Sequence, residues 1–168
     1  MSDGSISVKL APNYEMGQLQ KAVETDEQEN DIIQNDGYFP DMSISDFRNQ
    51  TRIDGTVTTQ RLTDAMIEAM ASVNHELAMF KTQYSAASLA LVEGSHIHGE
   101  SLLVYRYKRA VHCLAAANLY ERYLSYDSTN DGEKKMELLQ ESINRLRRDA
   151  RFAIADLLQQ KRINVELL

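Results

Sequence analysis

The chain has 168 residues, of which 43% are hydrophobic and 26% charged, as is typical of a single globular domain. It contains no run of about 18 apolar residues and no basic start followed by an apolar stretch, so we expect neither a membrane-spanning helix nor a secretory signal. The one cysteine, Cys113, excludes an intrachain disulfide and suits a reducing compartment.

The net charge of −7 is concentrated near the N-terminus. Residues 1–36 hold eight acidic residues and two lysines, whereas the rest of the chain holds 17 acidic and 16 basic residues. The folded part is therefore expected to be nearly neutral. The acidity of the whole chain does not argue against contact with nucleic acid, because most of the excess acidic residues lie in the N-terminal segment.

Residues 1–37 are predicted to form an acidic, flexible N-terminal arm. The stretch 24–31 is too polar to be buried. Before it, Ile6, Val8 and Leu10 alternate with polar residues, which is the period of a half-buried strand. Two interpretations stay open: a disordered terminus, or an arm in which these three residues add a strand to a neighbouring molecule.

Order is expected to begin near Tyr38, followed by a short helix at about 44–52. Ser43 and Asp46 resemble a capping arrangement for its first turn, and Asp54-Gly55 would end it. A second helix follows, with Thr58 or Thr59 as its N-cap. Its apolar residues recur at steps of three and four and are expected to pack in the core: Leu62, Met66, Ala69, Met70, Val73, Leu77, Phe80 and Tyr84.

The third and fourth helices are predicted at about 99–126 and 133–160, after a loop at 93–99. The third is apolar around most of its circumference at 110–117, which indicates a central helix packed on several sides. Its alanines would allow close approach of the neighbouring helices. The fourth has one apolar stripe, formed by Leu139, Ile143, Leu146, Ala150, Ala153 and Leu157.

These patterns predict an all-α fold. A bundle of about four helices, one short and three long, would span residues 38–161. Residues 162–168 are predicted to form a short C-terminal strand, because Ile163, Val165 and Leu167 alternate with polar positions. A lone strand needs a partner, so we expect this tail to pair with another molecule.

Catalytic motifs are hard to find in the sequence. It has no glycine-rich phosphate loop, no His-Glu-x-x-His and no paired cysteines. A metal site would need His96 and His98, together with His112 or Glu100, and loop residues two apart need not face the same way. Cys113 is expected to be a small core residue. We therefore expect a protein without a cofactor, a metal or an enzymatic activity.

Arginines gather in the run 145–151. On a helix, Arg147, Arg148 and Arg151 share one broad outer face, and such a face could contact phosphates. Glu141 stands four residues before Arg145, a favourable spacing for an ion pair. A solvent-exposed face stabilised by ion pairs is therefore an alternative explanation for the same arginines. Aromatic stacking partners are missing, which counts against recognition of single strands.

Several stretches together resemble the head completion (head stabilisation) protein family of P2-like temperate phages. Their order and spacing over about 38–168 carry the resemblance. They are Tyr38-Phe-Pro-Asp, Gly55-Thr-Val-Thr with Arg61-Leu, Val73-Asn-His-Glu-Leu, Gly99-Glu-Ser, Arg109-Ala-Val, Leu119-Tyr-Glu-Arg-Tyr, Arg145-Leu-Arg-Arg-Asp with Ala153-Ile, and Arg162 with Val165-Glu-Leu-Leu.

The resemblance implies a structural virion protein in the head–tail neck, assembled in the host cytoplasm. It would form a ring of typically twelve copies on the portal after DNA packaging, close the head, and present a surface to the next neck or tail-terminator protein. Double-stranded DNA would pass through the lumen, contacted without sequence specificity by Arg147, Arg148 and Arg151. The tail would dock on the portal or a neighbouring subunit through Arg162, Ile163, Val165, Leu167 and Leu168.

Two other classes of protein remain open from the sequence. A small helical DNA-binding or regulatory protein would bind free duplex with a steep dependence on salt. An enzyme would have to use His96, His98 or Glu100, and it would bind a stoichiometric metal ion.

Overall fold

The computed structural model describes residues 31–51, 57–124 and 132–161. Within these ranges the chain is mostly helical. The helices are α2 (Ile44–Gln50), α3 (Thr59–Glu76), α4 (Ala78–Gln83), α5 (Leu102–Leu124) and α6 (Gly132–Leu157), with a 3₁₀ turn η1 at Leu89–Leu91. None of the described helices is long and apolar enough to cross a membrane.

Two short strand pairs accompany the helices. The described residues are therefore mostly helical, as expected, but not all-α. The strands β1 (Ile32–Ile33) and β2 (Met42–Ser43) form one pair, and β3 (His96–Ile97) and β4 (Glu100–Ser101) form the other. Contacts divide the chain at Ile32, and the unit from Ile33 onward contains every helix named above.

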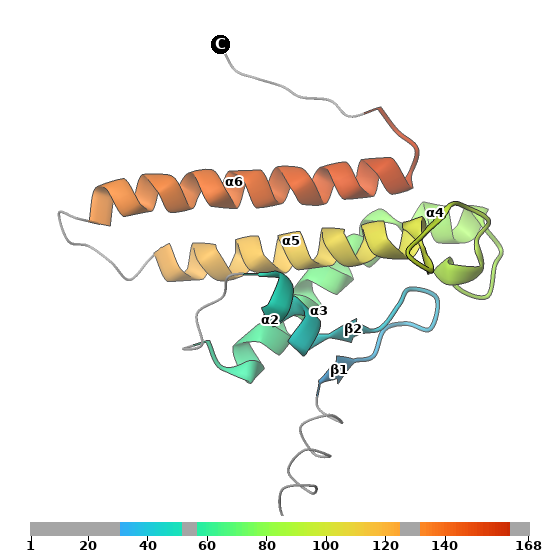
Figure 1. Cartoon of the computed structure of the whole chain (residues 1–168), viewed down its shortest axis with the longest axis horizontal. Coiled ribbons are helices and arrows are strands. Elements are labelled where there is room, and N and C mark those ends of the chain that lie inside the picture. Colours follow the sequence, from blue (N-terminus) through green and yellow to red (C-terminus); the bar gives the residue numbers. More distant parts are fainter. Residues whose placement is uncertain (1–30, 52–56, 125–131, 162–168) are drawn as a thin grey trace, which may run out of the picture. The chain divides into compact units, whose positions relative to one another are not determined.

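Helix α5 is the centre of this unit, as its sequence predicts. It runs antiparallel to α6 on one side and packs against α3 on another (Figure 1). The consecutive residues Ala115, Ala116 and Ala117 point about 100° apart from one another, yet all three are buried. Only a helix that is covered on several sides buries three successive residues in this way.

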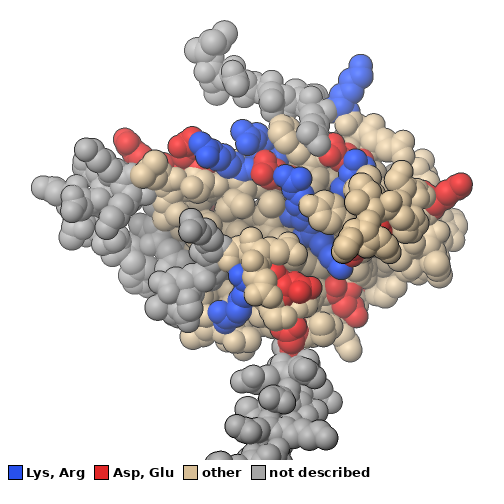
Figure 2. Space-filling model, in the orientation of Figure 1, with Lys and Arg blue, Asp and Glu red and all other residues tan. Residues whose placement is uncertain are grey.

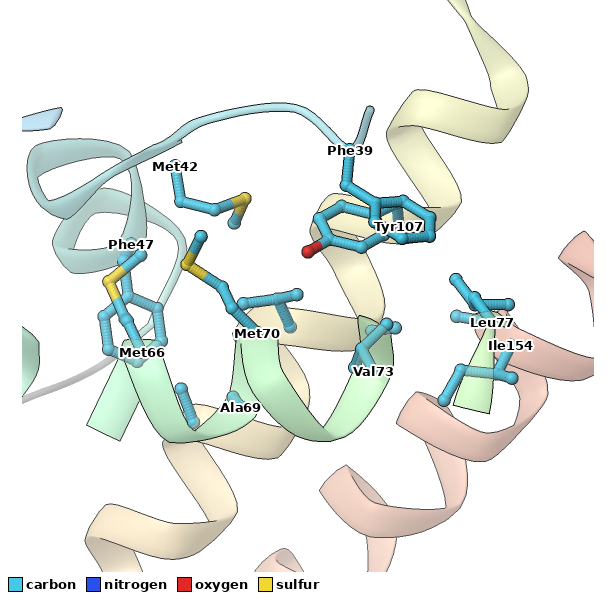
Figure 3. Packing of buried hydrophobic residues seen from close by; sticks show 14 of the residues in the cluster. Phe39, Met42, Phe47, Met66, Ala69, Met70, Val73, Leu77, Tyr107 and Ile154 are labelled. Atoms are coloured by element: carbon cyan, nitrogen blue, oxygen red, sulfur yellow. The ribbon is translucent and has the colours of Figure 1, made fainter. Parts of the chain in front are cut away.

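The apolar stripes of α3 and α6 face the core, as the helical spacing predicts. The buried residues of α3 are Leu62, Ala65, Met66, Ala69, Met70 and Val73. Figure 3 shows Met66 and Met70 near Phe47 of α2, and the ring of Phe39 lying against that of Tyr107. On α6, Ile143, Ala150, Ala153 and Leu157 are buried, while Leu139 and Leu146 are half-buried.

The predicted cap of α2 is confirmed. Ser43 adopts an extended conformation, and its hydroxyl accepts a hydrogen bond from the backbone N–H of Asp46, 3.0 Å away. The second predicted cap is confirmed only in position. Thr58 precedes α3, but its side chain makes no capping hydrogen bond.

The end of the second predicted helix and the start of the third were wrong. The second helix was expected to continue through Tyr84, but it breaks at Leu77, where ψ is 6° and the residue is fully buried. The third helix was expected to start near Gly99. Instead, residues 96–101 form a hairpin whose two turn residues, His98 and Gly99, have φ values of 54° and 79°. Positive φ at both positions is what a type I′ turn requires, and it keeps this segment out of the helix.

Helix α6 ends at Leu157, three residues before the predicted end. The backbone N–H of Gln160 donates to the carbonyl of Ala155, and that of Gln159 to the carbonyl of Asp156. Gln159 has a φ of 56°. This pairing is a Schellman motif, which satisfies the last carbonyls of the helix and turns the chain away from its axis.

His112 of α5 fastens α2 to the core. Its Nδ1 hydrogen bonds to Oε1 of Gln50 at 2.8 Å, and its ring packs on Phe47 with centroids 5.4 Å apart. Burial lowers the pKa of His112 from 6.5 to about 4, because desolvation disfavours the charged ring; nearby Asp46 raises the pKa and Lys108 lowers it. The ring is therefore neutral in the folded protein at neutral pH.

Stability is expected to fall as the pH drops from about 6.5 to 4, because the unfolded chain then binds a proton that the folded chain excludes. The loss attributable to this one residue is roughly 3 kcal/mol at the acid end. Chemical denaturation of wild type and His112→Gln at both pH values would measure it. An equal loss of unfolding free energy in the two proteins would show that His112 is not responsible.

Candidate functional site

The arginine run lies on the outer face of α6, beside α5. Arg147, Arg148 and Arg151 are all exposed, because the buried stripe of the helix occupies the opposite side. Arg109 and Arg122 of α5 are exposed as well. Figure 2 shows Lys and Arg side chains gathered along this part of the surface with acidic groups between them.

Ion pairs link several of these arginines to carboxylates. Arg147 contacts Glu121 of α5 at 2.5 Å. Asp149 lies 3.6 Å from both Arg148 and Arg109, so two guanidinium groups share one carboxylate across the α5–α6 contact. Arg148 also lies over the ring of Phe152, 5.9 Å from its centroid. The predicted i, i+4 pair between Glu141 and Arg145 is confirmed.

The geometry confirms the solvent face with ion pairs, and contact with phosphates stays a prediction. Exposed ion pairs are typically worth only about 0–1 kcal/mol each, so a phosphate could replace a carboxylate at little cost. Arg151 and Arg122 form no ion pair with any residue that the structure describes. The face can therefore make weak contacts to a phosphate backbone, and the carboxylates among the arginines limit their strength.

The residues considered for a metal site do not come together. His96 and His98 are exposed on the β3–β4 hairpin, whereas His112 is buried beneath α2. Glu100 is paired with Lys108 at 2.6 Å. Across residues 31–51, 57–124 and 132–161, no three His, Cys, Asp or Glu side chains are placed to hold a metal ion.

Cys113 is half-buried on α5, next to the α6 contact. Burial raises the pKa of its thiol, and Arg109 only partly opposes this effect. A raised pKa keeps the sulfur protonated and weakly nucleophilic near neutral pH. This environment is that of a packing residue.

Both predicted docking segments lie outside the described residues. They are the arm positions Ile6, Val8 and Leu10 and the tail positions Arg162, Ile163, Val165, Leu167 and Leu168. The structure nevertheless describes where the tail departs, which is the Schellman turn at Gln159.

Sequence reasoning missed a groove between α2, the β3–β4 hairpin and α5. It has a volume of about 940 Å³. Ile97 and Tyr105 line it, and both are largely exposed. The sequence signal for the hairpin that forms one wall was the dipeptide His98-Gly99, because His and Gly are both enriched at positive φ, which both residues adopt in the structure.

Comparisons with known proteins define the class to which this helical chain belongs. The family model of the phage head completion protein (GPL) matches residues 33–168. The match includes all the described helices, the arginine face and the tail, and it starts at residue 33, within the predicted arm at 1–37. The chain therefore belongs to the phage head completion protein family.

One relative is the head completion/stabilization protein of Escherichia phage P2. It is 39% identical over 127 residues, which cover 74% of this chain and 75% of that protein. No solved structure matches the chain significantly. The predicted resemblance to the head completion family is thus confirmed.

Proposed function

We propose that this protein is the adaptor that closes the filled phage head. It binds the portal vertex after DNA packaging, stabilises the head, and offers a joining surface to the next neck or tail-terminator protein. The observation that carries this proposal is the family match over residues 33–168, since it spans the whole helical unit and the tail. The P2 relative is named a head completion/stabilization protein, which supports the head-closing part of this proposal.

The proposed assembly for this role is a closed ring of twelve copies. Identical copies around a portal must meet through one repeated, heterologous contact that closes on itself. A strand-like segment that reaches out of the helical unit suits this contact, because strand addition joins molecules through backbone hydrogen bonds. Residues 162–168 have the alternating pattern for it.

Double-stranded DNA is the proposed content of the lumen, contacted without sequence specificity. The arginine face on α6 and α5 supports this assignment, because arginines interrupted by Glu121 and Asp149 make weak phosphate contacts. Weak contacts guide DNA without stalling its ejection. A density map of the assembled neck should place Arg147, Arg148 and Arg151 toward the lumen, and finding them on the outer wall would refute the assignment.

Complementation of defective heads tests the adaptor itself. DNA-filled heads that lack this protein are expected to lose their DNA to added nuclease, and the purified chain should restore protection. Heads that stay equally sensitive after addition would contradict the proposal. The matched control is the same heads incubated with an unrelated helical protein of similar size and charge.

The alternative of a DNA-binding or regulatory protein rests on the same arginine face. It predicts tight binding of free duplex by the isolated chain, with a steep loss of affinity as salt increases. The adaptor predicts weak binding even at low salt, because only a ring presents many arginines at once. A gel-shift titration at low salt separates the two functions.

A further inference from the structure

The groove between α2, the β3–β4 hairpin and α5 exposes large apolar side chains. Ile97 is 64% exposed on the hairpin and Tyr105 is 52% exposed on α5, and both line the groove with Leu102. Large apolar side chains that gather around one hollow usually mark a binding site. The groove is therefore a candidate for an apolar occupant.

The hairpin beside the groove has only two strands among the described residues. β3 and β4 pair antiparallel with His96 opposite Ser101 and Ile97 opposite Glu100, and among the described residues no further strand joins them. A two-stranded hairpin is marginal by itself, and its outer edges carry unpaired backbone groups. An extended segment with alternating apolar side chains fits such an edge, with the apolar side chains turned into the groove.

The end of α6, which precedes residues 162–168 in the chain, lies next to a hollow that shares a lining residue with this groove. Gln159, which turns the chain at the end of α6, lines a smaller hollow together with Ser95 and Leu102. Leu102 also lines the groove, so the turn that ends α6 and the groove are in contact with the same residue. Seven extended residues reach roughly 23–25 Å, about twice the length of the two turns of α5 from Leu102 to Arg109.

The groove is lined by equal numbers of acidic and basic residues, which favours an occupant with balanced charge. Asp46 and Glu100 line it together with Lys108 and Arg109, so its charge is balanced. A polyanion such as DNA, or the acidic stretch 24–31, would meet two carboxylates there. Residues 162–168 contain Arg162 and Glu166, one charge of each sign, and alternate Ile163, Val165 and Leu167 on one face.

We propose that this groove is the docking site for residues 162–168 of the same chain. The tail lies along β3 and α5 and covers Ile97 and Tyr105 in the unassembled protein. Attachment to its own chain is favoured over attachment to a second copy, because a short connection gives the tail a high effective concentration at the groove. The proposal concerns the free chain and does not depend on the adaptor function.

Paramagnetic relaxation in the full chain tests this docking. The spin label is placed at Glu166→Cys in a Cys113→Ser background, and the ¹⁵N-labelled protein is compared before and after reduction of the label. We expect loss of peak intensity at the amides of residues 96–109. Unchanged intensities at these amides would overturn the proposal.

A mixed sample distinguishes the same chain from a second copy. Here the ¹⁵N-labelled protein carries no spin label, and the spin-labelled protein carries no ¹⁵N. Intensity loss that occurs only when the ¹⁵N-labelled protein itself carries the spin label supports docking within one chain. Equal intensity loss in the mixed sample overturns it. Ile97→Ser with Tyr105→Ser should abolish the loss. Ile67→Ser, on α3 and 50% exposed, is the matched control and should leave the loss intact.

Discussion

Deletion of residues 162–168 is expected to abolish stable attachment of the protein to filled heads while leaving its helix content unchanged. Helix content should stay because α6 ends at Leu157 and is closed by the Schellman turn at Gln159, before the deleted segment. Attachment should be lost because the tail is the part of the family match with a strand pattern that needs an outside partner. Circular dichroism and co-sedimentation with filled heads would measure the two quantities.

Point variants make this prediction sharper than truncation. Serine at Ile163, Val165 and Leu167 removes one face of the predicted strand and should reduce attachment as strongly as the deletion. The matched control replaces Asn164 and Glu166 with Ser and Gln on the opposite face, and it should retain attachment. Normal completion of heads by the truncated chain would refute tail docking, and equal loss in both sets of variants would refute the strand register.

A tail that docks in its own groove before assembly would give these variants a second signature. The apolar variants should free the groove in the unassembled chain as well as weaken attachment. The groove variant at Ile97 and Tyr105 should free the tail but leave its docking face intact. The groove variant should then attach to filled heads as well as wild type or better. This result would distinguish the groove from the face of the tail that binds the head.

Local patterns predicted those parts of the fold that repeat along a helix. The apolar stripes of α3 and α6, the central place of α5 and the cap at Ser43 all follow from spacing within a few residues. The hairpin at 96–101 did not follow, because two-residue strands are too short to show a period. Gly99 suggested the start of a helix, but it serves a turn that needs positive φ.

The candidate site was predicted in part for the same reason. The spacing of Arg147, Arg148 and Arg151 was enough to place them on one exposed face. The pairing of Arg147 with Glu121 was not foreseeable, because the two residues are 26 positions apart and meet only when α6 packs on α5. The groove was also missed, because it is formed by three segments that have no common pattern in the sequence.

Replacement of Tyr107 is expected to be among the most destabilising single changes in the chain. Its ring is fully buried on α5 and stacks on Phe39, with centroids 4.9 Å apart. Its hydroxyl donates to Oδ1 of Asn74 at 2.6 Å and accepts from Nδ2 of Asn35 at 2.8 Å. Burial raises the pKa of Tyr107 well above its ordinary value of 10, which keeps this hydroxyl a donor.

Two variants separate the ring from the hydroxyl. Tyr107→Ala removes the ring as well and should cost roughly 4–5 kcal/mol, by analogy with large-to-small changes in other cores. Tyr107→Phe keeps the stacking on Phe39 but leaves Asn35 and Asn74 short of a partner, and should cost roughly 1–3 kcal/mol. Urea denaturation at neutral pH would measure both free energies of unfolding.

The loss of unfolding free energy in Tyr107→Phe shows how much the hydrogen bonds of this hydroxyl contribute to stability. Asn35 also donates to the carbonyl of Pro40 and accepts from Asn74, so the hydroxyl joins the segment before α2 to both α3 and α5. A Phe variant as stable as wild type would mean that packing alone holds this segment. A loss in the expected range, with faster hydrogen exchange at residues 35–42, would mean that the polar network fixes it to the helices.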